Sequence, residues 1–235
     1  MRLHLGRNLG HFFAQNLWLY ALTLIPLAQL FALEFSYPIL VGLGAALFLG
    51  ERMTPLRALT SLIGFCGILI VARPFGADGL SLGLIAAMVS AFGFAASALF
   101  TKQLTRTVDV SVLGIMFWMV TLQLIFGLGC ALLDGQVSWL SLQDLPWVMI
   151  YGFAGLWAHF CLTTALSIAP ASIVTPMDFL RLPLIAVIGM LFYSEPLDGY
   201  VFLGAVIIFG ANYANILNET RRRRAHSGNF GKKTT

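Results

Sequence analysis

About eight stretches of this sequence are apolar over a length that can cross a lipid bilayer. A membrane-spanning helix needs at least ~17 consecutive apolar residues. Turn-forming residues such as Pro26, Gly50, Pro146 and Pro170 separate the stretches. Backbone groups in hydrocarbon must find their partners inside the segment, so each stretch is expected to be a helix. The sequence therefore predicts an all-α integral membrane protein with about eight transmembrane helices, at roughly 8–25, 27–49, 55–73, 79–99, 111–133, 146–167, 171–193 and 199–217.

The composition fits lipid as the solvent. Only 10% of the 235 residues are charged, 59% are hydrophobic, and the mean hydropathy is +0.87. A soluble core of this length could not cover so much apolar surface. All three cysteines lie within apolar stretches, where we expect buried small apolar residues and neither a metal site nor a disulfide framework.

The basic residues predict which way the helices run. With eight crossings both termini lie on the same side, and twelve of the fourteen Lys and Arg residues then fall on that side as well. Basic residues concentrate on the cytoplasmic face of membrane proteins. We therefore expect a multi-pass protein of the cytoplasmic (inner) membrane with both termini cytoplasmic. The twelve are Arg2, Arg7, Arg52, Arg57, Lys102, Arg106, Arg221, Arg222, Arg223, Arg224, Lys232 and Lys233.

One long segment occurs twice, 144 residues apart, beginning at Ala21 and at Ala165. The informative matches are a proline pair, Pro26 with Pro170, a corner pair, Glu51 with Glu195, and an acidic pair, Glu34 with Asp178. On the expected topology the two copies run in opposite directions across the membrane. Inverted repeats of this kind are usual in secondary transporters, whose binding sites lie near the midplane.

Two stretches carry a family resemblance. PILVGLGAALFLGERMTPLRALTSLIGFCGILIVARP resembles the first EamA-type repeat of the drug/metabolite transporter superfamily, with its LGER corner and its Gly-rich helix that ends near Arg-Pro. ALSIAPASIVTPMDFLRLPLIAVIGMLFYSEPLDGYVFLGAVIIFGA resembles the end of the second repeat. The resemblance covers about 8–217 and implies a carrier of small metabolites. Branches with an FLRLP-type helix include riboflavin and S-adenosylmethionine carriers.

Members of that superfamily have ten helices in two repeats of five. The resemblance implies that this chain lacks the first two of the ten, giving an arrangement of three plus five. We expect a partial first repeat at 1–73, a second repeat at 74–218 and a disordered polybasic cytoplasmic tail at 219–235. A truncated start and a true eight-helix protein, in which a homodimer fills the gap, both remain open.

Ionisable residues inside a membrane are costly and usually face a cavity or a partner. Asp178 and Arg181 are three residues apart, hence on one helix face. They form either an internal ion pair or a wall that offers Arg181 to an anionic substrate group. Glu34 is the repeat mate of Asp178. A carboxylate removed from water holds a proton more readily, so either acid could couple transport to protons. The alternative for Glu34 is a bond to Gln29 or Tyr37.

Polar and aromatic residues on other helices complete the expected substrate site. His11, Gln15 and Trp18 lie at i, i+4 and i+7 and therefore share one stripe of the first helix. His159 occupies the position of Gln15 in the second copy. Trp18 and Tyr37 would suit a planar substrate by stacking. The predicted substrate-binding residues are Glu34, Asp178, Arg181, His159, Gln15, Trp18 and Tyr37.

Signatures of catalysis and of ATP hydrolysis do not occur in the sequence. It has no Walker loop and no HExxH, GxSxG or CxxC motif, so we expect no enzyme, catalytic residue, metal or cofactor. Arg221–Arg224 is a short run beside a membrane span, which suits orientation and contact with membrane lipid but not nucleic acid. The leading interpretation is a secondary carrier with alternating access. The alternatives are a non-transporting fragment or partner subunit and, more weakly, a membrane-embedded transferase.

Overall fold

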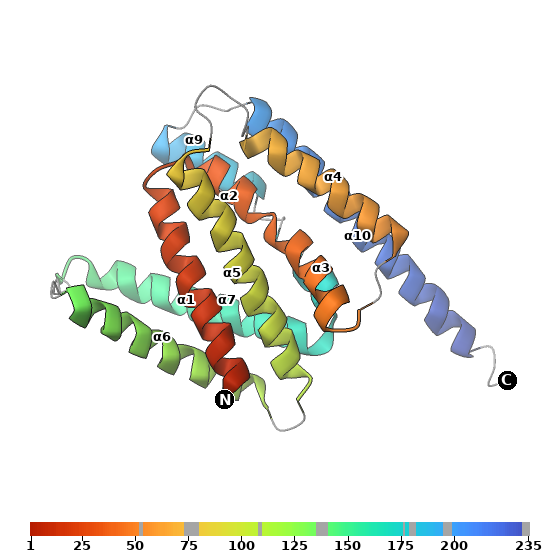
Figure 1. The fold of residues 1–235 in the computed structure, drawn as a ribbon, viewed down its shortest axis with the longest axis horizontal. Helices are drawn as coiled ribbons and strands as arrows, with labels where there is room; N and C mark the ends of the chain where they lie inside the picture. Colours follow the sequence, from red (N-terminus) through yellow and green to blue (C-terminus); the bar gives the residue numbers. More distant parts are fainter. Residues whose placement is uncertain are drawn as a thin grey trace.

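The computed structural model of the chain is a bundle of helices (Figure 1). It describes residues 1–51, 54–72, 80–107, 110–134, 141–175, 177–178, 182–194 and 199–231, and these residues form no strand. The helices are α1 (Arg2–Leu22), α2 (Leu27–Glu34), α3 (Tyr37–Phe48), α4 (Pro55–Ala72), α5 (Leu82–Thr105), α6 (Val112–Asp134), α7 (Leu145–Ile168), α8 (Ala171–Val174), α9 (Leu182–Tyr193) and α10 (Gly199–Gly231).

Four helical stretches are long and apolar enough to cross a membrane: Gln29–Phe48, Leu82–Thr105, Val112–Leu133 and Leu145–Ile168. Two further apolar helices, Ala58–Val71 and Gly199–Ala211, are shorter. The prediction of an all-α membrane protein is thus confirmed.

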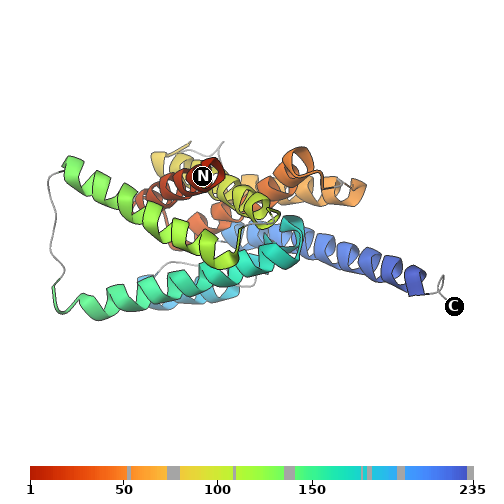
Figure 2. The same cartoon turned by 90° about the horizontal axis from the view of Figure 1, so that it is seen from below.

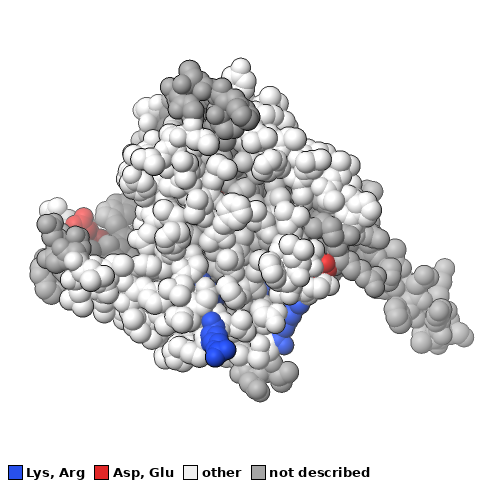
Figure 3. Space-filling model, in the orientation of Figure 1, with Lys and Arg blue, Asp and Glu red and all other residues white. Residues whose placement is uncertain are grey.

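One end of the bundle collects basic side chains, and we call it the basic end. Arg7 Nε donates to Thr101 Oγ1 at 2.8 Å, which joins the start of α1 to the last turn of α5. Arg106 Nη1 donates to Leu49 O at 2.6 Å, which brings the end of α3 to the same place. Figure 3 shows Lys and Arg atoms gathered toward the end where the chain begins, on a face with little other charge.

Two corresponding helices of the sequence copies, α1 and α7, reach the basic end with opposite termini. α1 precedes Pro26 and begins at the basic end, whereas α7 precedes Pro170 and finishes there (Figure 1). The finish of α7 is fixed by Lys102 of α5, whose Nζ donates to Leu166 O at 2.7 Å. Opposite directions of the two whole copies across the membrane remain a prediction.

Two of the expected continuous spans are interrupted in the structure. The stretch 27–49 consists of α2 and α3, with Phe35 and Ser36 between them, and the stretch 171–193 consists of α8 and α9. Pro38 lies in the first turn of α3. Proline is tolerated there because the first helical N–H groups have no intrahelical acceptor. In the second copy, α8 ends at Val174 and the described residues Thr175, Met177 and Asp178 are not α-helical, so each copy has an interruption within this stretch.

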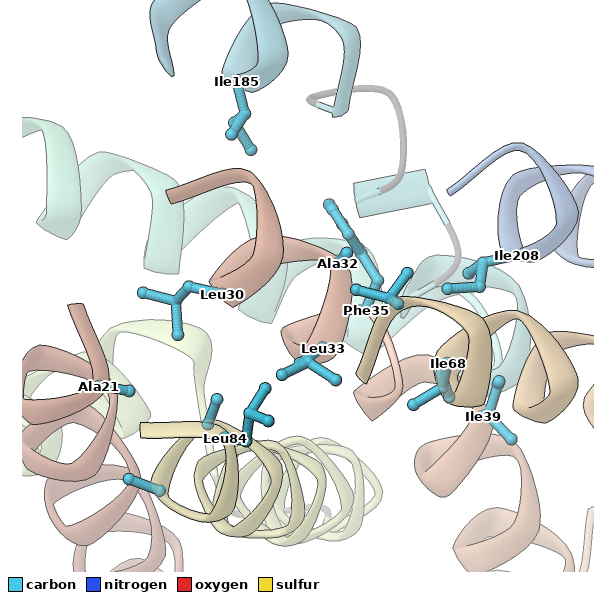
Figure 4. Packing of buried hydrophobic residues seen from close by; sticks show 13 residues of the cluster. Ala21, Leu30, Ala32, Leu33, Phe35, Ile39, Ile68, Leu84, Ile185 and Ile208 are labelled. Atoms are coloured by element: carbon cyan, nitrogen blue, oxygen red, sulfur yellow. The ribbon is translucent and has the colours of Figure 1, made fainter. Parts of the chain in front are cut away.

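The larger apolar core surrounds α2 (Figure 4). This short helix is covered on several sides, since its buried residues meet buried residues of α1, α4, α5, α9 and α10. Burial of that kind holds the end of α2, and hence Glu34, in a fixed place. The labelled members of the core are Ala21, Leu30, Ala32, Leu33, Phe35, Ile39, Ile68, Leu84, Ile185 and Ile208.

α4 and α10 lie side by side in close contact (Figure 1). A Cβ atom at Gly204 of α10 would lie 2.7 Å from Gly67 O and 2.5 Å from Val71 Cγ2. A Cβ atom at Gly67 of α4 would lie 2.9 Å from Gly204 O. Small residues at such crossings let membrane helices approach closely, and here they pack the last helix of one copy against that of the other.

α6 and α7 project together beyond the other helices, as the green and teal ribbons of Figure 2 show. Large apolar side chains cover most of their outer surface, as suits contact with lipid. Cys66, Cys130 and Cys161 are all exposed, so the prediction that they are buried is wrong. The reason is that lipid accepts apolar residues on the outside as readily as the core does.

α10 continues as a helix to Gly231 and so enters the segment 219–235 that was expected to be a disordered tail. No proline occurs after Pro196, and the helical stretch after Gly210 contains no glycine before Gly228. With no residue that breaks a helix, the backbone continues in helical geometry.

Lys102 offers a test of how the end of α7 is held. Its Nζ donates to Leu166 O and Ala169 O, both at 2.7 Å, and the side chain is 7% exposed. Hydrogen bonds from charged donors contribute about 1.5–3 kcal/mol, and Lys102→Met removes two while keeping the apolar stem. We expect the free energy of unfolding of this variant to fall by about 1.5–3 kcal/mol, which thermal unfolding in detergent would show as a lower midpoint. Gln103→Met, on the exposed side of the same turn, is the control, and equal midpoints for the two variants would contradict the proposed role.

Candidate functional site

Glu34 accepts a hydrogen bond from Trp18. The Nε1 atom of Trp18, on α1, lies 2.7 Å from Glu34 Oε2. The indole also packs edge-on against Phe31, with ring centroids 5.4 Å apart. Glu34 is the last residue of α2 and is 8% exposed. Because an indole N–H can only donate, this contact holds the carboxylate as an acceptor beside the break between α2 and α3.

Tyr37 joins the two copies of the repeat. It is the first residue of α3, and its hydroxyl donates to Asp178 Oδ2 at 2.5 Å. Tyr37 is buried and Asp178 is half-buried. Asp178 lies between the end of α8 at Val174 and the start of α9 at Leu182. The short bond therefore connects the broken helix of one copy to the broken helix of the other.

α1 and α7 bring together the remaining polar site residues. The rings of His11 and His159 meet edge-on with centroids 4.8 Å apart, and His11 also lies beside Phe94 of α5. Gln15 Nε2 donates to the hydroxyl of Tyr151 at 3.4 Å. Both histidines are half-buried. His11 and Gln15 of the predicted stripe thus face α7, the helix that corresponds to α1 in the second copy, whereas Trp18 faces α2.

The structure brings most of the predicted residues into two neighbouring groups. Trp18 and Glu34 form one pair, Tyr37 and Asp178 another, and all four lie at or beside the helix breaks. Gln15 and His159 lie on the α1–α7 side, each with a partner that the sequence did not suggest. The partner of Gln15 is Tyr151, and the partner of His159 is His11.

Some expectations differ from the observed contacts or fall outside them. Gln29 Nε2 donates to Val71 O at 3.4 Å, whereas the observed donor to Glu34 is Trp18. Arg181 and Pro176 lie outside the described residues, so the expected pairing of Arg181 with Asp178 remains a prediction. No group of three or more potential metal ligands occurs in the part of the chain that the structure describes.

Broken helices with acidic side chains can bind a polar solute inside a membrane. At the first break the backbone N–H groups of Phe35 and Ser36 still bond Phe31 O and Leu33 O, so a ligand there would meet side chains more than free backbone groups. The carboxylates of Glu34 and Asp178 add charge, and the rings of Trp18, Tyr37 and Phe31 add flat apolar surfaces. Such a set can recognise a small planar molecule with polar edges.

Comparisons with known proteins agree with this arrangement. The model of a family described as "EamA-like transporter family" matches residues 8–73 and 81–216. A riboflavin transporter of Rhizobium johnstonii is 33% identical over 221 residues, which are 94% of this chain and 72% of that protein. An S-adenosylmethionine uptake transporter of Rickettsia bellii is 26% identical over 220 residues, 93% of this chain and 73% of that protein.

The chain also shares a fold with solved structures. One crystal structure matches with a TM-score of 0.69 and 17% sequence identity, over 94% of this chain and 77% of that one. At this identity the match concerns the path of the backbone and not the ligand.

Proposed function

Because the chain belongs to the EamA-like transporter family, we propose that it is a secondary active transporter that moves a small metabolite across the cytoplasmic membrane by alternating access. The family and its named relatives are transporters, so the chain is a transporter and not an enzyme, and the transferase alternative is wrong. Basic residues on one side support a topology with both termini in the cytoplasm.

The hydrogen bond between Tyr37 and Asp178 is the observation that carries this proposal. It bridges two broken helices that belong to the two copies of one sequence. In alternating access, two repeats rock about a site near the bilayer midplane. A contact between the repeats at their breaks is where substrate binding can change their relative position.

The proposed substrate has a heteroaromatic ring with polar edges. Relatives are named as transporters of riboflavin and of S-adenosylmethionine, and both molecules contain such rings. Trp18 and Tyr37 offer ring faces for stacking, while Glu34 and Asp178 accept hydrogen bonds from ring N–H or hydroxyl groups. His159 and Gln15 extend the polar surface toward α7. Glu34 or Asp178 carries the coupling proton.

Arg181 is proposed to hold an anionic or carboxylate group of the substrate. It lies within an apolar segment and three residues after Asp178. An ion pair or substrate contact made by a guanidinium is worth enough that Arg181→Ala is expected to lower uptake about tenfold or more. Arg181→Lys should restore part of it because the charge remains. Wild-type uptake of a metabolite panel by Arg181→Ala would remove this residue from the site.

Counterflow in proteoliposomes tests the function. Vesicles loaded with unlabelled riboflavin should transiently accumulate labelled riboflavin, and S-adenosylmethionine is the second candidate. Only a carrier that exchanges substrate through a closed cycle gives this overshoot. Its absence for both compounds and for a wider panel would favour the alternative, a partner subunit or fragment that does not transport alone.

A further inference from the structure

A continuous polar stripe follows α1 from the basic end to the substrate site. It consists of His4, Arg7, His11, Gln15 and Trp18, which recur every three or four residues and so share one helix face. The last three belong to the candidate site described above. His4 and Arg7 have no part in it, although both are buried, with exposed fractions of 6% and 2%.

The guanidinium of Arg7 has neutral partners. Its Nε donates to Thr101 Oγ1 at 2.8 Å, its Nη1 to Asn8 Oδ1 at 3.1 Å, and its Nη2 to Met119 Sδ at 3.3 Å. No carboxylate is paired with it among the residues that the structure describes. A guanidinium has five N–H donors, so these three contacts leave N–H groups that can donate to a ligand.

Arg106 and Lys102, two other basic side chains at this end, make different contacts. Arg106 lies 3.8 Å from Glu51 Oε1 and also donates to a backbone carbonyl. Lys102 closes the end of α7 through two carbonyl oxygens. Arg7 and Lys102 are both buried, at 2% and 7% exposed, but the hydrogen bonds of Arg7 go to side chains of three other residues and not to the backbone carbonyls that end a helix.

A buried cation without an opposite charge nearby is costly, although the three hydrogen bonds of Arg7 offset part of that cost. Removing an ion from water costs several kcal/mol unless an opposite charge is brought near. A neutral glutamine could make comparable bonds to Thr101 and Asn8 without that cost. An anion supplied from outside the chain would offset it.

A second buried polar atom lies beside Arg7 without a partner. The Nδ1 atom of His4 makes no hydrogen bond within the described part of the chain, and His4 precedes Arg7 by one turn. Gln123 of α6 closes the same group, since its Nε2 donates to Asn8 O at 3.2 Å and to Asn8 Oδ1 at 3.4 Å. The cluster therefore holds a cation, an unused imidazole nitrogen and neutral amides, and no acid.

We propose that Arg7 and His4, with Thr101 and Gln123, form an anion-binding site at the basic end, distinct from the site at the helix breaks. It takes a carboxylate or phosphate group, whether from a dissolved anion or from a lipid headgroup. The planar fork of a guanidinium matches both groups. α6 borders the cluster on one side, since it carries Met119 and Gln123.

Binding measurements on the purified, complete chain test this site without any transport assay. In neutral detergent, potassium phosphate is titrated by calorimetry against potassium chloride of equal ionic strength. In parallel, thermal midpoints are compared in nanodiscs of phosphatidylcholine with and without phosphatidylglycerol. A response to phosphate identifies a dissolved anion, and a response only to phosphatidylglycerol identifies a lipid headgroup.

Variants assign the response to the cluster. Arg7→Gln is expected to weaken binding about tenfold or more and Arg7→Lys less, because charged hydrogen bonds are the strong ones. His4→Ala should weaken it by a few-fold. Arg106→Gln is the control and should bind as the wild type does. If Arg7→Gln does not fold, the anion response of Arg7→Lys and His4→Ala shows whether the cluster is the binding site. The proposal is overturned if the wild type responds in neither arm, or if these Arg7 and His4 variants respond like the wild type.

Discussion

Replacing Glu34 with glutamine is expected to reduce substrate uptake at least about tenfold and to remove its dependence on external pH. The carboxylate is buried at the end of α2 and accepts a hydrogen bond from Trp18 Nε1 at 2.7 Å. A hydrogen bond to a charged group contributes about 1.5–3 kcal/mol, and glutamine keeps the shape and an acceptor but not the charge. Glutamine also cannot titrate, so a proton that Glu34 carries through the cycle would no longer move.

The experiment compares uptake into right-side-out vesicles across external pH for Glu34→Gln, Asp178→Asn and both together. Asp144→Asn is the matched control, because Asp144 is an exposed carboxylate outside the site that bonds Ser141 at the start of α7. Size-exclusion profiles in detergent establish that each variant is folded. Should Glu34→Gln and Asp178→Asn both keep full pH-dependent uptake, proton coupling through these acids is wrong.

Gly204→Leu is expected to destabilise the protein more than any surface change on the same helix. Its Cβ alone would lie 2.7 Å from the backbone oxygen of Gly67 and 2.5 Å from Val71 Cγ2. Backbone cannot move aside as a flexible side chain can, so α4 and α10 must separate. Overpacking costs about 1–3 kcal/mol for added methylenes, and a leucine at this crossing should reach at least the upper part of that range.

Gly210→Leu supplies the control for this prediction. Gly210 is on α10 less than two turns further along, and a Cβ there meets nothing within 4 Å. Thermal unfolding in the same detergent should give a clearly lower midpoint for Gly204→Leu, while Gly210→Leu stays near the wild type. Similar midpoints for both variants would mean that α4 and α10 do not pack at this crossing.

Membrane class and family could be predicted from the sequence because each depends on long segments. The apolar stretches, the proline pair Pro26 and Pro170, and the acidic pair Glu34 and Asp178 are visible without a structure. The prediction also identified the α1 stripe correctly, since helical periodicity alone puts Gln15 and Trp18 on one face.

Finer features could not be predicted, for physical reasons. The break at Phe35 and Ser36 is an exception, because Pro38, in the first turn of α3, is a local signal for a broken helix near this position. The bond from Tyr37 to Asp178 joins residues 141 apart in sequence, and nothing in a single sequence pairs them. Exposure of Cys66 was missed because apolar side chains face lipid and core alike, so periodicity does not separate the two.

Alternating access is the central claim, and a single cysteine at position 36 tests it most directly. Ser36 lies between α2 and α3, next to both acid–aromatic pairs. With the three native cysteines replaced, a membrane-impermeant thiol reagent is applied to right-side-out and to inverted vesicles, with and without substrate. We predict labelling from each side in turn and protection by substrate in both. Labelling from one side only, whatever the substrate concentration, would contradict a site that opens to both faces of the membrane.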